Sequence, residues 1–586
     1  MARPISGKER VKTIRQKRKN GDIYIYEKRV IYNPEKGYDD CLGSKLVGKI
    51  RNGATEVITV TPRKDAAAKK AATKSEDTLI SRQKIGLTDI LAFLGRESGI
   101  DDDLKAAMPK SSDDLAAQII SIARYWVATE GDTLPHLKYW QMTHPLPCED
   151  LDEDAYHDLF RYIGLTPGIQ YKYSKARAVR LSAPCCIAID STTFGTYSQR
   201  VHEARQGFNK DGDGLDTVKY LSLYAIENRQ PLAFTRQPGN IPDVISVKNA
   251  IKTLDWLDLE KPTVVMDNGF YSQSNIAQLL LNNLKFLARV EVGSCKWIKN
   301  IVLDNLDKLG GYSTICPFDG QINGITLPVK HEFSTTCKYN TENHKAGEKV
   351  KFTRRLYLHV FLDHETANDK RATMNLKVKE LEKDLREGRW PQLSYSSQRL
   401  AARLFNLRKS TNGLKVTVKE DCWHELIKLY GVFVLISNNA KFDTFQALTS
   451  YRARTTQETF FSKDKGMTDG KRIRVQSSDT LDGRFFCQMV ALGYREKLYE
   501  KIRLVKAELD VIDDSVAKGE ANLRRKLRSW LNNVSAQEIL EWFDCVELVK
   551  IVRPDSHPAK TIKITTETTA RDELFLKMIG MDDYRG

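Results

Sequence analysis

The sequence predicts an α/β protein in which a mixed β-sheet core is interrupted by a large, mainly β insertion. In residues 179–290, short apolar strands alternate with helical patterns in the order β-β-β-α-β-α-β. A further apolar strand, "GVFVLISN", follows only after residues 291–429 have broken that rhythm. Helical periodicity dominates residues 79–165 and the chain beyond about residue 500. Alternating strands and helices are typical of the α/β class, and the late return of a core strand indicates an insertion.

The first part of the chain, residues 1–178, is basic and is expected to be mainly helical. Residues 1–20 carry eight lysines and arginines against one acid, Glu9. This start could be a phosphate-binding arm or a solvated tail, because charge predicts attraction to polyanions but no particular fold. "GDIYIYEKRVIYN" alternates like one strand of a hairpin, and "SSDDLAAQIISIARYWVATEG" predicts a helix with Ser112 as its N-cap.

In the first core segment, residues 179–290, two predicted strands each end in an aspartate. "APCCIAID" ends at Asp190 and "PTVVMD" ends at Asp267. Between them, "VKYLSLYAIENRQPLAFTRQPGN" predicts a hairpin that turns at residues 228–230, followed by a helix. Ligands usually bind at the carboxyl edge of such a sheet, so both aspartates are candidate site residues.

The remaining segments are the insertion, the rest of the core and a tail. Residues 291–429, the insertion, contain strands such as "RLYLHVFLD" and one charged helix, "NLKVKELEKDLREG". The core resumes over residues 430–500 with "GVFVLISN" and a helix predicted over 443–465, which Gly466 ends. Residues 501–586 are expected to be a charged, helical tail.

Composition narrows the class of protein. The 586 residues include 92 lysines and arginines against 76 acids, which gives a net charge of +16 and suits a polyanionic partner. Ten cysteines include no CxxC pair, so a disulfide framework is not expected and a reduced cytosol fits. No apolar stretch approaches the length that a bilayer-spanning helix needs. We therefore expect a soluble intracellular protein without membrane contact.

Four side chains of the predicted helix 443–465 share one face: Tyr451, Arg454, Glu458 and Lys465. Their offsets of 0, 3, 7 and 14 span a stripe about 60° wide at about 100° per residue. Alone, this stripe could be a salt-bridged face, and either aspartate could be a helix cap. Three converging carboxylates, however, repel one another unless a cation neutralises them. Mg²⁺ fits that need, because it binds few carboxylates and keeps positions for phosphate oxygens and water.

The spacing Tyr-x2-Arg-x3-Glu-x6-Lys resembles the signature of DDE-type transposases of bacterial insertion sequences, in the large group called insertion sequence four. Three more blocks resemble that family: "AIDSTTFG" at Asp190, "DNGFYS" at Asp267 and "RQPGNIPD" between them. The order Asp, Asp, Glu with a long insert before the glutamate also agrees, and the resemblance covers about residues 180–500. Asn268 stands where the family commonly has arginine, which puts a local phosphate contact or salt bridge in doubt.

The resemblance implies an RNase H-like catalytic core in which Asp190, Asp267 and Glu458 bind two Mg²⁺ ions, for which Mn²⁺ can substitute. It implies that Tyr451, Arg454 and Lys465 contact DNA. The expected reaction is cleavage by water at the ends of the mobile element, followed by attack of the freed 3′-OH on target DNA.

The resemblance also implies the partners. Expected partners are double-stranded DNA, at the element ends and at the target, and a second copy of the chain in a synaptic complex. The expected location is the bacterial cytosol, at the nucleoid. Within the expected DNA-binding region 1–178, either the basic hairpin region 1–60 or the helices of 79–165 could read bases.

Two alternatives stay open at this point. An RNase H-like nuclease would cut DNA without joining it, and a repressor that has lost catalysis would bind element ends without cutting them. The three acids argue against the repressor, because binding alone has no use for converging carboxylates.

Other motifs carry less weight. "NKDGDGLDTVKY" begins like a calcium loop but has Tyr220 where a bidentate glutamate is needed. His331 and Cys337 lack the paired spacing of zinc ligands, and there is no GxxxxGK[ST] motif, so no nucleotide cofactor is expected.

Overall fold

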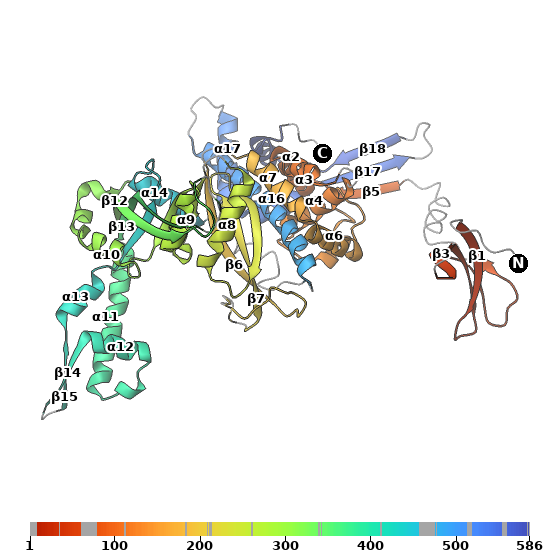
Figure 1. Ribbon diagram of the computed structural model, residues 1–586. Coiled ribbons are helices and arrows are strands. Elements are labelled where there is room, and N and C mark those ends of the chain that lie inside the picture. Colours follow the sequence, from red (N-terminus) through yellow and green to blue (C-terminus); the bar gives the residue numbers. More distant parts are fainter. Residues whose placement is uncertain are drawn as a thin grey trace. The chain divides into compact units, whose positions relative to one another are not determined.

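The computed structural model describes the chain except for residues 1–8, 34–35, 60–78, 110–112, 182–184, 208, 210–211, 213, 260–261, 338–339, 341–342, 411–412, 456–474, 476, 512–517, 554–559, 583 and 585–586. The described chain divides into two compact units (Figure 1). The first unit comprises residues 1–82 and 548–565, and the second comprises residues 83–547 and 566–586.

The first unit is built from strands. An antiparallel sheet contains β1 (Glu9–Lys17), β2 (Ile23–Asn33), β3 (Tyr38–Ile50) and β4 (Ile58–Thr59), in that order. Strand β2, which covers the segment predicted as one strand of a hairpin, buries Ile25 and Val30. Most of a second sheet, in the order β18 (Lys560–Thr565), β17 (Glu547–Arg553) and β5 (Leu79–Lys84), belongs to the same unit. The expected helical N-terminal region therefore opens with a sheet, and the expected helical tail contains a hairpin.

The second unit is organised around a nine-stranded mixed sheet. Its strands, in spatial order, are β11 (Ile315–Cys316), β12 (Asp319–Thr336), β13 (Lys349–Asp363), β16 (Val432–Ser437), β10 (Lys285–Val290), β9 (Thr263–Met266), β6 (Cys186–Thr196), β7 (Asp216–Ala225) and β8 (Gln230–Pro238). The three central strands β10, β9 and β6 are parallel, and the other pairs are antiparallel. The predicted order β-β-β-α-β-α-β over residues 179–290 is confirmed.

Helices cover both faces of this sheet. One face packs against α8 (Asp243–Leu257), α9 (Gln273–Leu281) and α10 (Lys296–Leu303), with Ile187, Val264 and Phe286 in the shared core. On the other face, Phe194 and Tyr220 pack against Phe485 of the long helix α16 (Ser478–Asp510). The central strands read as continuous apolar runs because both of their faces are buried.

Further helices surround α16. They are α2 (Gly86–Glu97), α3 (Ile100–Ala107), α4 (Asp113–Ala128), α5 (Leu137–Trp140), α6 (Glu153–Leu165), α7 (Pro167–Val179), α17 (Lys518–Asn533), α18 (Ala536–Phe543) and α19 (Ala570–Ile579). Two glycines permit the close crossing of α6 and α16. A Cβ atom at Gly164 would lie 1.7 Å from the carbonyl oxygen of Asp479, and one at Gly483 would lie 1.9 Å from that of Phe160. Any side chain at either position would force these helices apart.

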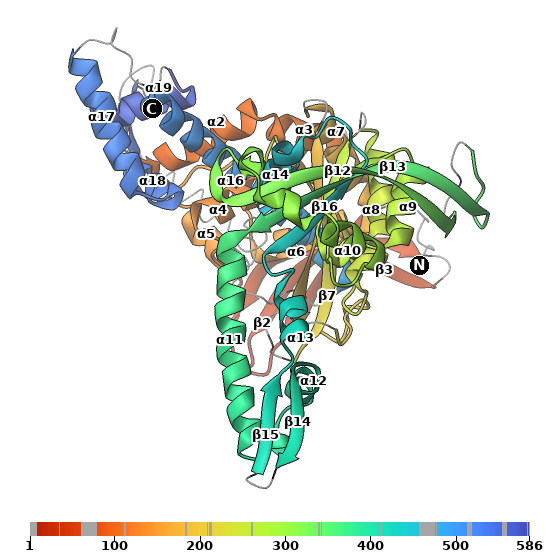
Figure 2. The ribbon, with the colours of Figure 1, turned by 90° about the vertical axis from the view of Figure 1, so that its left-hand side faces the viewer.

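The segment predicted as an insertion divides into two parts. Its strands β12 and β13 extend the central sheet, since β13 pairs with β16 along Tyr357–Leu362. An arm follows, made of α11 (His364–Arg386), α12 (Tyr395–Leu404), β14 (Phe405–Ser410), β15 (Gly413–Val418) and α13 (Glu420–Ile427). Figure 2 shows α11 running from the end of β13 to the far part of this arm. The arm has its own apolar cluster, so the segment is mixed rather than mainly β.

The short elements complete the description. The 3₁₀ turns are η1 (Leu134–His136), η2 (Asn268–Phe270), η3 (Leu306–Gly310), η4 (Tyr312–Thr314) and η5 (Trp390–Gln392), and α14 (Thr444–Arg452) follows β16. None of the described helices combines the length and hydropathy required to cross a bilayer. All ten cysteines are free thiols in the structure.

Candidate active site

Asp190 and Asp267 lie side by side at the centre of the large sheet. Asp190 belongs to β6, and Asp267 follows the last residue of β9. The two strands are parallel neighbours, with Ile189 in register with Met266. The residue after Ile189 and the residue after Met266 are both aspartates. Their carboxylates therefore lie at the same level on neighbouring strands, which are about 4.8 Å apart. The two acids are neighbours as expected, but the prediction that the first strand ends at Asp190 is wrong, because β6 stays paired with β7 as far as Thr196.

Two residues of the predicted stripe contact the acid pair. The phenol of Tyr451 donates a hydrogen bond of 2.8 Å to Oδ1 of Asp267. The guanidinium of Arg454 lies 3.9 Å from Oδ2 of Asp190 and 3.8 Å from Oδ2 of Asp267. It also lies over the ring of Tyr451, 5.4 Å from its centroid. Arg454 therefore supplies positive charge between two carboxylates that would otherwise repel each other.

Both contacting side chains are buried, whereas the acids are partly open. Tyr451 is 7% exposed and Arg454 is 5% exposed. The side chain of Asp267 is 35% exposed and that of Asp190 is 18% exposed. Burial, and next the charge of Asp267, raise the pKa of Tyr451 to about 12. The phenol therefore keeps its proton at neutral pH and remains a donor to Asp267.

The remaining stripe residues, Glu458 and Lys465, lie outside the described residues. The described part also changes the helix that was predicted over 443–465, since α14 ends at Arg452. The backbone N–H of Arg454 donates to the carbonyl of Tyr451, a spacing of three residues rather than four. The chain tightens at this point, so a single straight α-helical face does not describe the step from Tyr451 to Arg454. Contact of these two residues with DNA stays a prediction.

A buried lysine and a third aspartate support the acid pair from behind. Asp243, at the start of α8, accepts hydrogen bonds from the hydroxyl of Ser191 at 2.5 Å and from the ammonium of Lys219 at 2.8 Å. The backbone N–H of Ser191 in turn donates to Oδ1 of Asp190 at 2.8 Å. A Cβ atom at Gly269, in the turn after Asp267, would lie 3.5 Å from Asp243. This network fixes the middle of β6, at Asp190 and Ser191, to Asp243 at the start of α8.

The donor set of the acid pair fits a divalent cation. Carboxylate oxygens are the ligands that Mg²⁺ and Mn²⁺ prefer, and two aspartates on adjacent strands leave coordination positions for water and phosphate. Within the described ranges, no group of three or more histidine, cysteine, aspartate or glutamate residues is placed to hold a metal ion. The described residues thus provide two acidic ligands, Asp190 and Asp267.

A cavity of about 420 Å³ opens beside Asp267 and contains residues that sequence reasoning missed. Tyr451 and Arg454 line it together with Arg289 of β10, Lys370 of α11 and Phe433 of β16. An arginine inside the apolar strand "KFLARVE" was a visible signal for Arg289. Nothing marked Lys370, because it is one of many charges on α11.

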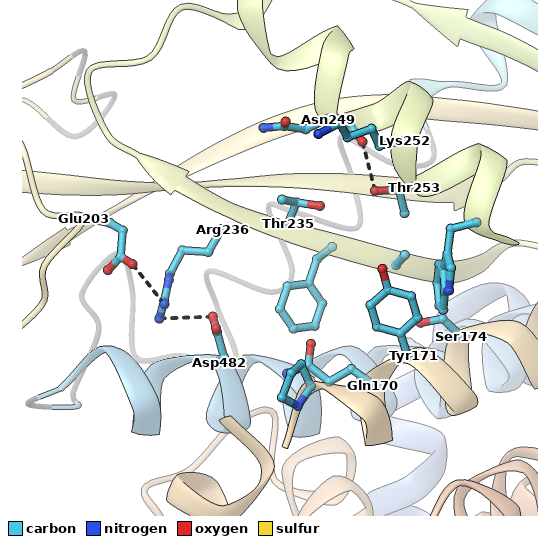
Figure 3. Close-up of a pocket in the computed structure, with 14 residues that line it drawn as sticks. Gln170, Tyr171, Ser174, Glu203, Thr235, Arg236, Asn249, Lys252, Thr253 and Asp482 are labelled. Carbon is cyan, nitrogen blue, oxygen red and sulfur yellow. Dashed lines mark hydrogen bonds and ion pairs between the residues drawn. The ribbon is translucent and has the colours of Figure 1, made fainter. Parts of the chain in front are cut away.

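A second cavity, of about 400 Å³, lies elsewhere in the same unit, lined by residues of α7, α8, β8 and α16 (Figure 3). Arg236 of β8 points across it to Glu203 at 3.0 Å and to Asp482 of α16 at 3.3 Å. Burial raises the pKa of Asp482 to about 6, and the charge of Arg236 partly opposes this. Because the arginine is engaged by both acids, this cluster joins α16 to the sheet edge.

Comparison with known proteins shows which family the chain resembles. The family model described as the transposase DDE domain matches residues 181–492. A search of curated proteins finds no match. Among solved structures, the chain is similar to a piggyBac transposase in a cryo-EM synaptic complex with hairpin DNA, at 9% identity over 78% of each chain, with a TM-score of 0.33.

The matched range contains Asp190, Asp267, Tyr451 and Arg454, and it covers more than half of the 586 residues. It begins just before β6 and ends within α16, so it spans the central sheet and the arm. The chain belongs to the family of proteins with a transposase DDE domain.

Proposed function

We propose that this DDE transposase binds both ends of a bacterial insertion sequence, cuts the DNA there and joins the freed 3′-OH to target DNA. The observation that carries the proposal is the acid pair: Asp190 and Asp267 at one level of parallel strands, contacted by Tyr451 and Arg454. Strand order and the spacing of the stripe support an RNase H-like core of the insertion-sequence-four group.

In this proposal Asp190, Asp267 and Glu458 hold two Mg²⁺ or Mn²⁺ ions. Bound there, the metal supplies positive charge to phosphate oxygens and makes water a stronger nucleophile. Tyr451 holds one oxygen of Asp267, which limits the orientations that this carboxylate can take. Arg454 balances the charge of both acids and, with Lys465, contacts phosphates of the bound strand.

The proposal extends to the partners and location of the protein. Two DNA ends must be cut and joined together, so a second copy of the chain is required in a synaptic complex. The net charge of +16 favours binding to DNA, with the N-terminal region 1–178 as the proposed end-binding part. The proposed location is the bacterial cytosol, where the element's DNA lies.

The test is a reaction with purified protein, Mg²⁺, DNA that flanks its own gene, and a plasmid target. Variants Asp267→Asn and Glu458→Gln run in parallel. Joined products from the wild type alone are expected. Cleavage without joining would favour a nuclease, and binding of the ends without cleavage by any of the proteins would favour a repressor.

A further inference from the structure

The cavity beside Asp267 is continuous with the acid pair, because Asp267, Tyr451 and Arg454 line it. Its other walls come from β10, from the end of β13 with the first turns of α11, and from β16. A volume of about 420 Å³ lies within the range of pockets that hold small ligands or parts of larger ones. A ligand in this cavity must therefore lie next to any phosphate or metal ion bound at Asp190 and Asp267.

The charges of the cavity favour an anion. Arg289 and Lys370 are both exposed and both line it. No ion pair holds either of them within the part of the chain that the structure describes. Arg452, another lining residue, is held by Asp319 at 3.0 Å. Two cations from different elements, β10 and α11, are therefore available to a ligand.

The acid in this wall is already engaged. Asp363 caps α11 and accepts hydrogen bonds from the backbone N–H of Thr366 at 3.0 Å and from its hydroxyl at 2.8 Å. Its carboxylate thus caps the N-terminus of α11, where a negative charge is stabilised by the free backbone N–H groups and the helix dipole. Phe433 adds an apolar surface, and the guanidinium of Arg289 lies 5.7 Å from the centroid of its ring. The cavity combines two cations with one aromatic face.

We infer that this cavity is a subsite for the phosphodiester next to the scissile one, with Arg289 and Lys370 as its phosphate contacts and Phe433 beside the attached sugar. The inference rests on the proposed function, since a DNA strand held at Asp190 and Asp267 continues directly into the cavity. Consecutive phosphates of one strand advance about 3.4 Å along a duplex, so a neighbouring phosphate must lie close by. Lys370 belongs to α11, so the arm contributes a residue to the active site.

The experiment combines single-residue variants with single neutral phosphates. Element-end DNA carries one methylphosphonate, which removes the charge of one phosphate, at each position around the cut in turn. Binding to wild type, Arg289→Ala and Lys370→Ala is measured by fluorescence anisotropy. Arg371→Ala is the matched control, because Arg371 is the exposed neighbour of Lys370 on α11 and does not line the cavity. Melting temperatures establish that the variants are folded.

Each variant should weaken binding about ten-fold, the loss of one charged hydrogen bond, and the methylphosphonate at one position adjacent to the cut should weaken it about a hundred-fold, because both cations contact that phosphate. A variant combined with the methylphosphonate at that position should still bind only about a hundred-fold more weakly, because the neutral phosphate has already lost that contact. For Arg371→Ala, the loss of binding caused by the variant and the loss caused by the methylphosphonate should simply add at every position. Additive losses for Arg289→Ala and Lys370→Ala at all positions would overturn the subsite. If the losses are non-additive at one position but the wild type never cuts unmodified ends, the subsite is supported and the proposed transposition is refuted.

Discussion

The phenol of Tyr451 donates a 2.8 Å hydrogen bond to Oδ1 of Asp267 from a position 184 residues later in the chain. Removing the hydroxyl in Tyr451→Phe keeps the ring and its packing and frees that carboxylate oxygen. The variant should cut element ends about ten-fold more slowly, because one hydrogen bond to a charged group contributes about 1.5 kcal/mol. The measurement is kcat and KM for end cleavage.

The fall should appear in kcat, since in the proposed mechanism this hydrogen bond orients a carboxylate that binds metal. Tyr312→Phe is the control, because Tyr312 is 92% exposed. Equal rates for Tyr451→Phe and wild type would contradict a role for this hydrogen bond.

Arg454 should matter for stability as well as for catalysis. It is 5% exposed and lies within 3.9 Å of both acids, so Arg454→Ala removes a positive charge from beside two adjacent carboxylates. Because Asp267 is partly exposed, we expect a loss of about 1–3 kcal/mol in the free energy of unfolding, measured with urea.

Mg²⁺ should then restore more stability to Arg454→Ala than it adds to the wild type, because binding to the folded state alone raises its stability. The comparison uses melting temperatures at rising Mg²⁺ concentration, with Arg371→Ala as control. A metal response that is identical in all three proteins would argue against charge balance by Arg454.

Part of this site could be predicted from the sequence and part could not. Asp190 and Asp267 each follow a short apolar run, a local pattern, and parallel pairing of β6 with β9 aligns them, although β6 itself continues to Thr196. Arg289 and Lys370 line one cavity only because the fold places β10 and α11 around it, and no local pattern encodes that arrangement. For the same reason the pairing of β13 with β16, which makes the first part of the insertion a portion of the sheet, was not predicted.

His359 should make the protein less stable in mild acid. It is fully buried, its Nδ1 lies 2.8 Å from the hydroxyl of Thr326, and burial lowers its pKa to about 4. Between pH about 6.5 and about 4 the unfolded chain binds a proton that the folded chain does not bind. The free energy of unfolding should therefore fall by about 1.4 kcal/mol for each unit by which the pH decreases within that window.

The measurement is the free energy of unfolding of wild type and His359→Gln at pH 7, 6 and 5. The advantage of the wild type over His359→Gln should shrink as the pH falls. A constant difference between wild type and His359→Gln would show that His359 keeps its ordinary pKa when folded.

Asp482 should have the opposite effect on the pH dependence of stability. Its side chain is 23% exposed, and burial raises its pKa to about 6, above the ordinary 3.8. Between these values the folded state binds a proton that the unfolded state does not bind, so this group adds stability as the pH falls from about 6 to about 4. Compared with Asp482→Asn, the wild type should gain relative stability from pH 7 to pH 5. A relative loss in urea unfolding would refute this assignment.

The arm should be removable without loss of the central sheet. The two ends of the arm lie close together, since the backbone N–H of Asp363 donates to the carbonyl of Gly431 at 2.9 Å. Its apolar cluster, with Leu381 and Leu404, is separate from the core of the sheet. Replacing residues 371–427 with a short glycine–serine linker keeps Lys370 and should leave a cooperative unfolding transition, measured by circular dichroism.

Deleting residues 295–425 instead would remove β12 and β13 and should destroy the fold, because β13 pairs with β16 inside the sheet. The trimmed variant is therefore the sharper test of whether the arm clamps DNA. Since α11 alone is 23 residues, or about 35 Å, long, the arm can reach about ten base pairs from the acid pair. We expect the trimmed protein to bind element ends at least ten-fold more weakly and to cut short and long ends equally. Full-strength binding by the trimmed protein would show that the arm does not hold DNA.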